Sequence, residues 1–127
     1  MTRSTVTAPD LTPPVGPFAQ SVWAGDLLYA SGQVGQDPFS GILVSGGIEA
    51  ETRQAFENIR RVLAAAGLGF GHIVKTSVFL ANIDDFAAMN AIYGQMFEAP
   101  FPARTTVEVV RLALGARVEI DFVAQRP

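Results

Sequence analysis

The stretch IEAETRQAFENIRRVLAAA, residues 48–66, is the clearest secondary-structure signal in this chain of 127 residues. Its apolar residues recur every three or four positions, the spacing of one helix face. Glu49 and Glu51 stand in the first turn, where negative charge complements the helix dipole, and Gly67 supplies a natural stop. We therefore expect a helix from Ile48 to Ala66 that buries Ile48, Thr52, Ala55, Phe56, Ile59, Val62, Leu63 and Ala66.

The segments on either side predict strands and a second helix. Four prolines make residues 8–17 an irregular lead-in, and two short strands then meet at the turn Gly25-Asp26. After the first helix we expect a strand over residues 72–83 and a second helix over 85–97, capped by Asp84. Two final strands, 104–112 and 117–124, follow around a turn at Gly115. The second helix would bury Phe86, Met89, Tyr93 and either Met96 or Phe97.

This order of elements predicts one α+β domain over residues 1–127, with one sheet and both helices on the same face. The other face would be open, and a second subunit usually closes such a face. Charged residues are 17% of the chain, against about 25% in an average domain. So few charges on a small domain favour an oligomer that buries part of the surface.

The composition also argues against several classes of function. The formal net charge is −3 and there is no basic tract, which argues against a primary role in binding nucleic acid. The chain has no cysteine and a single histidine, so thiolate nucleophiles and multi-histidine metal sites are excluded. The first residues lack the apolar core of a signal peptide, and no apolar run is long enough to span a membrane. We expect a cytoplasmic protein.

The last two strands carry most of the candidate chemistry. Alternation places Arg104, Thr106 and Glu108 on one face of the first strand and Arg117, Glu119 and Asp121 on one face of the second. If the two strands pair as a hairpin, that face carries mixed charge. The simplest interpretation is a solvated face with ion pairs, each contributing only ~0–1 kcal/mol.

Other candidates are weaker. His72 fits a surface position at the start of a strand, and Lys75 fits an outward position on it. A Schiff base at Lys75 would require a depressed pKa, which a sequence does not reveal. The glycine-rich stretch SGQVGQ, residues 31–36, matches no phosphate-loop spacing.

Several longer motifs carry a resemblance to a known family. They are GPFAQSVWAGDLLYASGQV, GGIEAETRQAFENIRRVLAAAG, VKTSVFLANIDDFAAMNAIY, PARTTVEVVRL and GARVEIDFVA, in that order along nearly the whole chain. The chain closely resembles the Rid family, also called the YjgF family, whose best-known members are imine deaminases. The resemblance implies a chorismate-mutase-like fold, with three copies around a central β-barrel and a ligand cleft at each subunit interface.

The resemblance also implies a reaction. Family members hydrolyse 2-imino acids and their enamine forms, such as 2-aminoacrylate, to 2-keto acids and ammonia, without a metal or an organic cofactor. The arginine of the PAR motif, here Arg104, would grip the substrate carboxylate with its guanidinium fork. The first glutamate of VEID, here Glu119, would activate the attacking water as a general base. The remaining family positions in the cleft are Ser31, Gly32, Asn90 and the backbone near Thr106.

Three departures from the family pattern leave alternatives open. Phe18 stands where deaminases usually have tyrosine, Thr106 where bacterial members often have cysteine, and Ala113 where a proline is usual. A non-catalytic or regulatory small-molecule binder that uses the same cleft is therefore the alternative to a deaminase. A specialised pathway deaminase and a weak endoribonuclease remain, the latter using a local basic patch of Arg53, Arg60 and Arg61.

Overall fold

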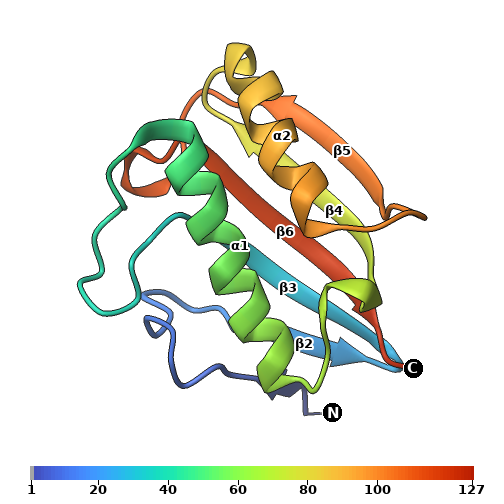
Figure 1. The fold of residues 1–127 in the computed structure, drawn as a ribbon. Coiled ribbons are helices and arrows are strands. Elements are labelled where there is room, and N and C mark those ends of the chain that lie inside the picture. Colours follow the sequence, from blue (N-terminus) through green and yellow to red (C-terminus); the bar gives the residue numbers. More distant parts are fainter. Residues whose placement is uncertain (1) are drawn as a thin grey trace.

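Two helices lie across one face of a six-stranded mixed sheet in the computed structural model, which describes residues 2–127 (Figure 1). The strands are β1 (Ser4–Val6), β2 (Ser21–Ala24), β3 (Leu27–Val34), β4 (Ile73–Leu80), β5 (Ala103–Glu108) and β6 (Val118–Gln125). The helices are α1 (Gly47–Ala65) and α2 (Phe86–Met96), and short 3₁₀ turns span Phe70–His72, Ile83–Asp85 and Ala113–Gly115. The α+β class and the two helices on one face are as predicted.

Most of the predicted stripe of α1 is buried against the sheet, but Ile48 and Ala66 at its two ends are only partly buried. Thr52, Ala55, Ile59, Val62 and Leu63 have no exposed surface. The two helices then meet through aromatic rings, since Phe56 of α1 packs edge-on against Tyr93 and Phe97, with centroid distances of 5.7 and 5.8 Å. This packing holds α2 over β4 and β5.

The start of α2 differs from the prediction. Asp84 does not cap the helix, because residues Ile83–Asp85 form a 3₁₀ turn of their own and α2 begins at Phe86. Asn82 caps that turn, and its side-chain oxygen accepts a hydrogen bond from the Asp84 N–H at 2.9 Å. The two neighbouring polar residues both suit a cap, and the sequence does not reveal which one the chain uses.

The order of the strands corrects the predicted hairpin. The sheet runs β1-β2-β3-β6-β4-β5, and β4 and β5 are the parallel pair. β6 pairs antiparallel with both β3 and β4, so it lies in the middle of the sheet and does not pair with β5. Val118, Ile120 and Phe122 of β6 are almost completely buried, as expected for a central strand whose side chains lie under the helix layer. The predicted face of mixed charge from β5 and β6 therefore does not exist.

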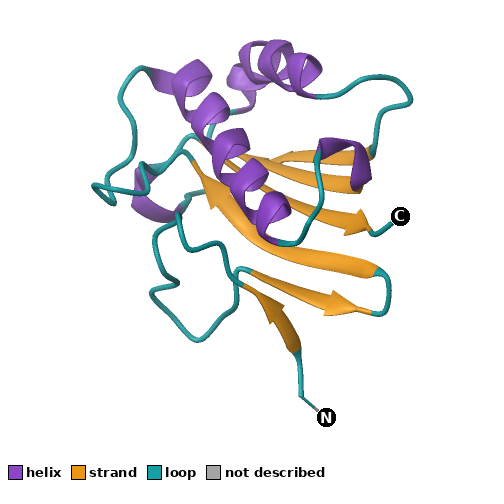
Figure 2. Ribbon diagram, turned by 60° about the horizontal axis from the view of Figure 1, so that its bottom comes forward, coloured by secondary structure: helices purple, strands orange, loops and turns teal. Residues whose placement is uncertain are grey.

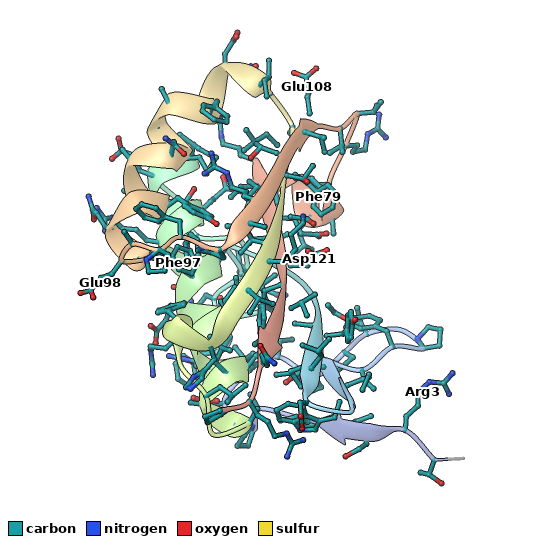
Figure 3. All side chains as sticks on the ribbon, turned by 90° about the vertical axis from the view of Figure 1, so that its right-hand side faces the viewer. Arg3, Phe79, Phe97, Glu98, Glu108 and Asp121 are labelled. Atoms are coloured by element: carbon teal, nitrogen blue, oxygen red, sulfur yellow. The ribbon has the colours of Figure 1, made fainter. Side chains whose placement is uncertain are left out.

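The second face of the sheet carries no helix (Figure 2). We call it the open face and define it by Lys75, Ser77, Phe79, Glu119 and Asp121, which alternate along β4 and β6 with buried residues. In Figure 3, Phe79 and Asp121 project to this side, whereas Phe97 lies on the helix side. Tyr29 and Val107 are also exposed large hydrophobic residues of the sheet.

Within residues 2–127, the structure contains no helix with the length and apolar character needed to cross a membrane.

Candidate active site

Four of the predicted site residues line one pocket of about 760 Å³. Phe18 comes directly after the proline-rich lead-in, Ser31 and Gly32 come from β3, and Glu119 comes from β6. The volume is in the range of small-molecule sites, which are about 300–1,000 Å³. The pocket therefore gathers residues that are far apart in the sequence around a single carboxyl group.

A bulge in β3 shapes the floor of this pocket. The pairing of β3 with β6 shifts register between Ala30 and Gln33, so Ser31 and Gly32 stand outside the regular ladder. The Ser31 N–H donates to the Gln20 carbonyl at 2.9 Å, and its hydroxyl donates to the Ala19 carbonyl at 2.7 Å. These bonds hold the lead-in against the bulge, as bulges near functional sites often re-aim a strand.

Gly32 is required here by the closeness of Glu119. A Cβ atom on Gly32 would lie 2.6 Å from the Glu119 Oε2 atom, well inside contact distance. Any side chain at position 32 would push the carboxylate away. The bare backbone of Gly32 therefore sets where the Glu119 carboxyl group can lie.

Glu119 has the electrostatic character of a proton acceptor. Burial raises the pKa of its carboxyl group above the usual value of 4.5, and the nearby Asp121 carboxylate raises that pKa further. No arginine or hydrogen-bond donor acts on that pKa in the opposite direction. A carboxylate that is partly dehydrated and unpaired binds a proton more strongly than one in water. Such a group suits general acid–base chemistry.

Phe18 forms part of an apolar wall beside this carboxyl group. Its backbone N–H donates to the Gly16 carbonyl at 2.8 Å, which folds residues 16–18 into a tight turn. The ring is 53% exposed and lines the pocket together with Val15 and Leu114. Phenylalanine places an aromatic ring at this position without a hydroxyl group.

The predicted carboxylate-binding arginine lies elsewhere, under α2. The Arg104 Nη1 atom donates to the Asn90 Oδ1 atom at 2.7 Å, and the guanidinium carbon lies 4.6 Å from the centre of the Tyr93 ring and 5.4 Å from that of Phe86. Tyr93 is itself held by a buried hydrogen bond of 2.7 Å between its hydroxyl and that of Thr76. Arg104 is therefore oriented by an amide and two rings, while the rest of its donor fork remains available.

Thr106 follows Arg104 on the same face of β5. Its hydroxyl oxygen is buried and has no hydrogen-bond partner within the described part of the chain. A buried hydroxyl usually finds a partner, so an unpaired one two residues from Arg104 on the same strand is a feature to explain. Glu108, next on this face, is already engaged, because its carboxylate accepts a hydrogen bond from the Ile83 N–H at 2.9 Å.

The structure therefore divides the predicted site residues into two groups. Arg104 lies opposite Thr76 of β4, which is buried under the helices, whereas Glu119 lies opposite Phe79 on the open face. Residues directly opposite in a sheet point to the same side. Within one copy of the chain, the Arg104 and Glu119 side chains project from opposite faces and at different points along β4.

Arg117 also departs from the prediction. Alternation predicts that it shares a face with Glu119 and Asp121, but it precedes the first residue of β6. Its side chain approaches Glu51 at 3.7 Å and Asp85 at 3.9 Å, and its backbone N–H donates to the Glu51 carboxylate at 2.8 Å. Arg117 thus ties the start of β6 to the helix layer and does not face the pocket.

The suggested basic patch on α1 is largely neutralised. Arg60 forms an ion pair with Glu57, and Arg61 lies 3.3 Å from Glu57 and 3.7 Å from Asp10. Arg53 donates a hydrogen bond to the Gln95 side chain at 3.2 Å. Two of the three arginines therefore have carboxylate partners, which weakens this face as a site for nucleic acid.

The sequence analysis did not predict several residues of the site. Val15 and Leu114 line the pocket, and Tyr93 supports Arg104. Leu114 could have been noticed as a large apolar residue directly before the turn glycine Gly115.

A second cavity, of about 320 Å³ between the end of α2 and the start of β4, contains none of the predicted site residues. Across residues 2–127, no three histidine, cysteine, aspartate or glutamate side chains form a group that could hold a metal ion.

Known proteins resemble this chain over almost its whole length. A family model described as endoribonuclease L-PSP matches residues 8–126. The human 2-iminobutanoate/2-iminopropanoate deaminase is 48% identical over 110 residues, which cover 87% of this chain and 80% of the human protein. Among solved structures, YyfA of Yersinia pestis, described as a conserved Rid family protein of unknown function, superposes with a TM-score of 0.94 at 40% identity and covers 98% of this chain and 100% of its own. E. coli TdcF with bound serine gives a TM-score of 0.91 at 31% identity, covering 98% and 99%.

Proposed function

This chain belongs to the endoribonuclease L-PSP family, also called the Rid or YjgF family, and on that premise we propose that it is an imine deaminase. It hydrolyses 2-imino acids and their enamine forms to 2-keto acids and ammonia. The observation that carries this proposal is the unpaired Glu119 carboxyl group, whose pKa is raised, in a pocket with an apolar wall. The 2-iminobutanoate/2-iminopropanoate activity in the name of the human relative supports the same reaction.

Glu119 acts on the attacking water. The carboxylate takes a proton from water as the oxygen adds to the carbon of the N-protonated imine, which gives a neutral intermediate bearing both a hydroxyl and an amine. The same carboxyl group then returns that proton to the amine, the C–N bond breaks and ammonia leaves, and the carboxylate takes the hydroxyl proton as the carbonyl forms. Its raised pKa serves both steps, because one group must accept a proton and then donate it.

Arg104 binds the carboxylate of the substrate. Its guanidinium can offer two parallel N–H donors, and each charge-assisted hydrogen bond is worth ~1.5–3 kcal/mol. Asn90 and Tyr93 hold the side chain in position for this contact. The unpaired Thr106 hydroxyl and the neighbouring backbone complete the anion site, while Ser31, Gly32 and Phe18 form the walls around the reacting carbon.

The two groups act together only if two copies of the chain meet. Arg104 stands on the edge strand β5, which has a free side for a neighbour, and the open face exposes Tyr29 and Val107. A homotrimer, which joins the Arg104 group of one copy to the Glu119 pocket of the next, would complete the site. The small proportion of charged residues supports such an assembly.

A substrate with a small carboxylate is consistent with the relatives. The solved structure of E. coli TdcF contains bound serine, a small molecule with a carboxylate and an amine. Hydrolysis of an imine changes no oxidation state, so the residues described above suffice for the proton transfers. No step requires a metal or an organic cofactor.

A non-catalytic binder of the same small carboxylates is the alternative, and Phe18 is the observation that favours it. The phenylalanine ring cannot donate the hydrogen bond that a tyrosine hydroxyl could make to the water or to the substrate. One neutral hydrogen bond is worth only ~0.5–1.5 kcal/mol, or about tenfold in rate. Proton transfer by a positioned side chain contributes ~10²–10⁴-fold. These magnitudes favour a slowed enzyme over an inactive one.

A coupled assay tests the proposal. An amino-acid oxidase generates 2-imino acids from amino acids in situ, and the loss of the imine is followed with and without this protein. We expect faster loss with the wild type, and an equal or at most about tenfold higher rate with Phe18→Tyr. If the wild type hydrolyses no 2-imino acid and Phe18→Tyr does, the protein is a binder that lost the reaction. If neither does so, the deaminase proposal fails.

A further inference from the structure

Leu114 has an unusual backbone for a large side chain. Its φ and ψ angles are 61° and 13°, the left-handed region, and it is the only residue other than glycine with a positive φ among residues 2–127. Gly115 beside it also has a positive φ, of 69°. The left-handed region is unfavourable for residues with a Cβ atom, and leucine has no side-chain hydrogen bond to offset the cost. Leucine is thus a costly choice for this turn.

Packing in the core does not explain this choice. The Leu114 side chain is 56% exposed and does not belong to the buried core cluster. It lines the pocket that contains Glu119. Strained residues that the core does not need are concentrated at functional sites.

Leu114 is one part of a larger apolar wall. Val15, which is 93% exposed, and Phe18 line the same pocket, and they come from the lead-in at the other end of the chain. Three large apolar side chains therefore face one cavity next to a carboxyl group without burying each other. An exposed apolar group of this kind, rimmed by polar residues, marks a binding surface.

We propose that Leu114, with Val15 and Phe18, selects the side chain of the substrate, so that this protein prefers 2-imino acids with apolar side chains longer than ethyl. This inference rests on the proposed function, because it assumes that the reacting carbon lies beside Glu119. A methyl or ethyl group gives the wall little to contact. Each additional methylene that the wall removes from water adds a factor of about four in binding.

Binding measurements test the wall separately from catalysis. The products of the reaction are 2-keto acids, so isothermal titration calorimetry is carried out with pyruvate, 2-oxobutanoate, 2-oxopentanoate and 2-oxohexanoate. For the wild type we expect affinity to rise about fourfold with each methylene after 2-oxobutanoate. In Leu114→Ala this rise should be largely lost, whereas Leu114→Met, which keeps an apolar side chain of similar reach, should retain it.

Two further variants separate the side chain from the backbone. Leu114→Gly relieves the positive φ and Leu114→Ala does not, so an equal loss of chain-length preference in both assigns the effect to the side chain. Val110→Ala is the matched control, because Val110 is 97% exposed in the same connection but lies outside the pocket. We expect it to behave as the wild type. Thermal melting of each variant checks that folding is intact.

The imine assay completes the test with the same chain-length series. A wild-type preference for longer side chains that falls about tenfold or more in Leu114→Ala supports the inference. Hydrolysis of all imines with no dependence on chain length overturns it and leaves the deaminase intact. If no imine is hydrolysed, the proposed function fails, and the calorimetric series still decides the role of Leu114. Equal affinity for all four keto acids in the wild type overturns the inference in either case.

Discussion

Arg104 and Glu119 are held in opposite ways. The guanidinium of Arg104 is oriented by direct contacts, with a hydrogen bond of 2.7 Å to Asn90 and the rings of Tyr93 and Phe86 at 4.6 and 5.4 Å. The carboxyl group of Glu119 has no such partner, and burial and Asp121 raise its pKa. A group that recognises a planar carboxylate needs a defined orientation, whereas a group that accepts a proton needs a high proton affinity.

The two regions also occupy different parts of the fold. Arg104 lies on the edge strand β5 on the helix side, and Glu119 lies on the central strand β6 on the open face. In the proposed mechanism, one copy of the chain therefore carries two halves of the site that it cannot bring together. This difference indicates that the fold positions each of the two groups independently. In our proposal, the assembly of copies brings Arg104 of one copy close to Glu119 of another.

The largest expected effect comes from removing the base. Glu119→Gln keeps the size of the side chain but cannot accept a proton, so we expect kcat/KM for imine hydrolysis to fall ~10²–10⁴-fold. Binding of a 2-keto acid should change much less. A variant with more than a tenth of the wild-type rate would show that another group activates the water.

The same substitution should make the protein more stable at neutral pH. The folded-state pKa of Glu119 is raised above the unfolded value, so the neutral form is favoured by folding, and this contribution is lost as the pH rises through the folded-state pKa. Above that pH the ionised carboxylate opposes folding. Glu119→Gln removes the charge, and its melting temperature should exceed that of the wild type at pH 7 but not at pH 3.

The next largest effect concerns the anion site. Arg104→Ala removes both donors of the fork, so we expect kcat/KM to fall at least ~10²-fold, because each charge-assisted bond is worth ~1.5–3 kcal/mol. Arg104→Lys should lose most of the activity as well, since a point charge does not replace the fork. Folding and oligomeric state, followed by circular dichroism and light scattering, should be unchanged. Wild-type turnover in Arg104→Ala would remove Arg104 from the site.

A smaller effect is expected from displacing the carboxylate without changing it. Gly32→Ala places a Cβ atom where the Glu119 Oε2 atom lies at 2.6 Å, so the carboxylate must shift. A shift of about 1 Å in a catalytic group can cost ~10²-fold, and part of this loss should appear in kcat. Gly71→Ala is the matched control, because nothing lies within 4 Å of its Cβ position. Equal activity in both variants would show that the position of Glu119 is not critical.

The smallest effect is a change in pH dependence. The Asp121 carboxylate is the second cause of the raised pKa of Glu119, after burial. Asp121→Asn removes that charge, so the pKa of Glu119 falls and its ionised form persists to lower pH. The acidic limb of kcat/KM should therefore move to lower pH, with little change on the plateau. An acidic limb that stays in place or moves to higher pH would show that Glu119 does not control it.

Much of the fold followed from local patterns in the sequence. The stripe on α1, the turn at Gly25 and the helix-strand-helix order depend on periodicity and turn chemistry, which act over a few residues. The pairing of β6 with β3 and β4 did not follow. Neighbouring strands in a sequence often form a hairpin, and only the tertiary packing decides that β6 enters the middle of the sheet.

The candidate site residues came from the family motifs and stay a prediction. The family motifs named Arg104 and Glu119, and the structure adds the contacts of Arg104 and the partly buried, unpaired environment of Glu119. Alternation within each strand does not show which side chains of two different strands lie on the same face of the sheet. It therefore could not reveal that Arg104 and Glu119 project from opposite faces. Leu114 was missed because its positive φ is a property of the folded turn, and the sequence pattern alone favours an ordinary loop.

Complementation between two inactive variants tests the central claim most directly. Arg104→Ala and Glu119→Gln are unfolded together in equal amounts, refolded, and assayed against each variant refolded alone. If each site combines Arg104 of one copy with Glu119 of another, the mixture should regain up to about a quarter of the wild-type activity, because half of the copies carry each intact group. The wild type refolded in the same way sets the reference. A mixture no more active than the two separate variants would contradict the account, because Arg104 and Glu119 would then have to act within one copy or not together at all.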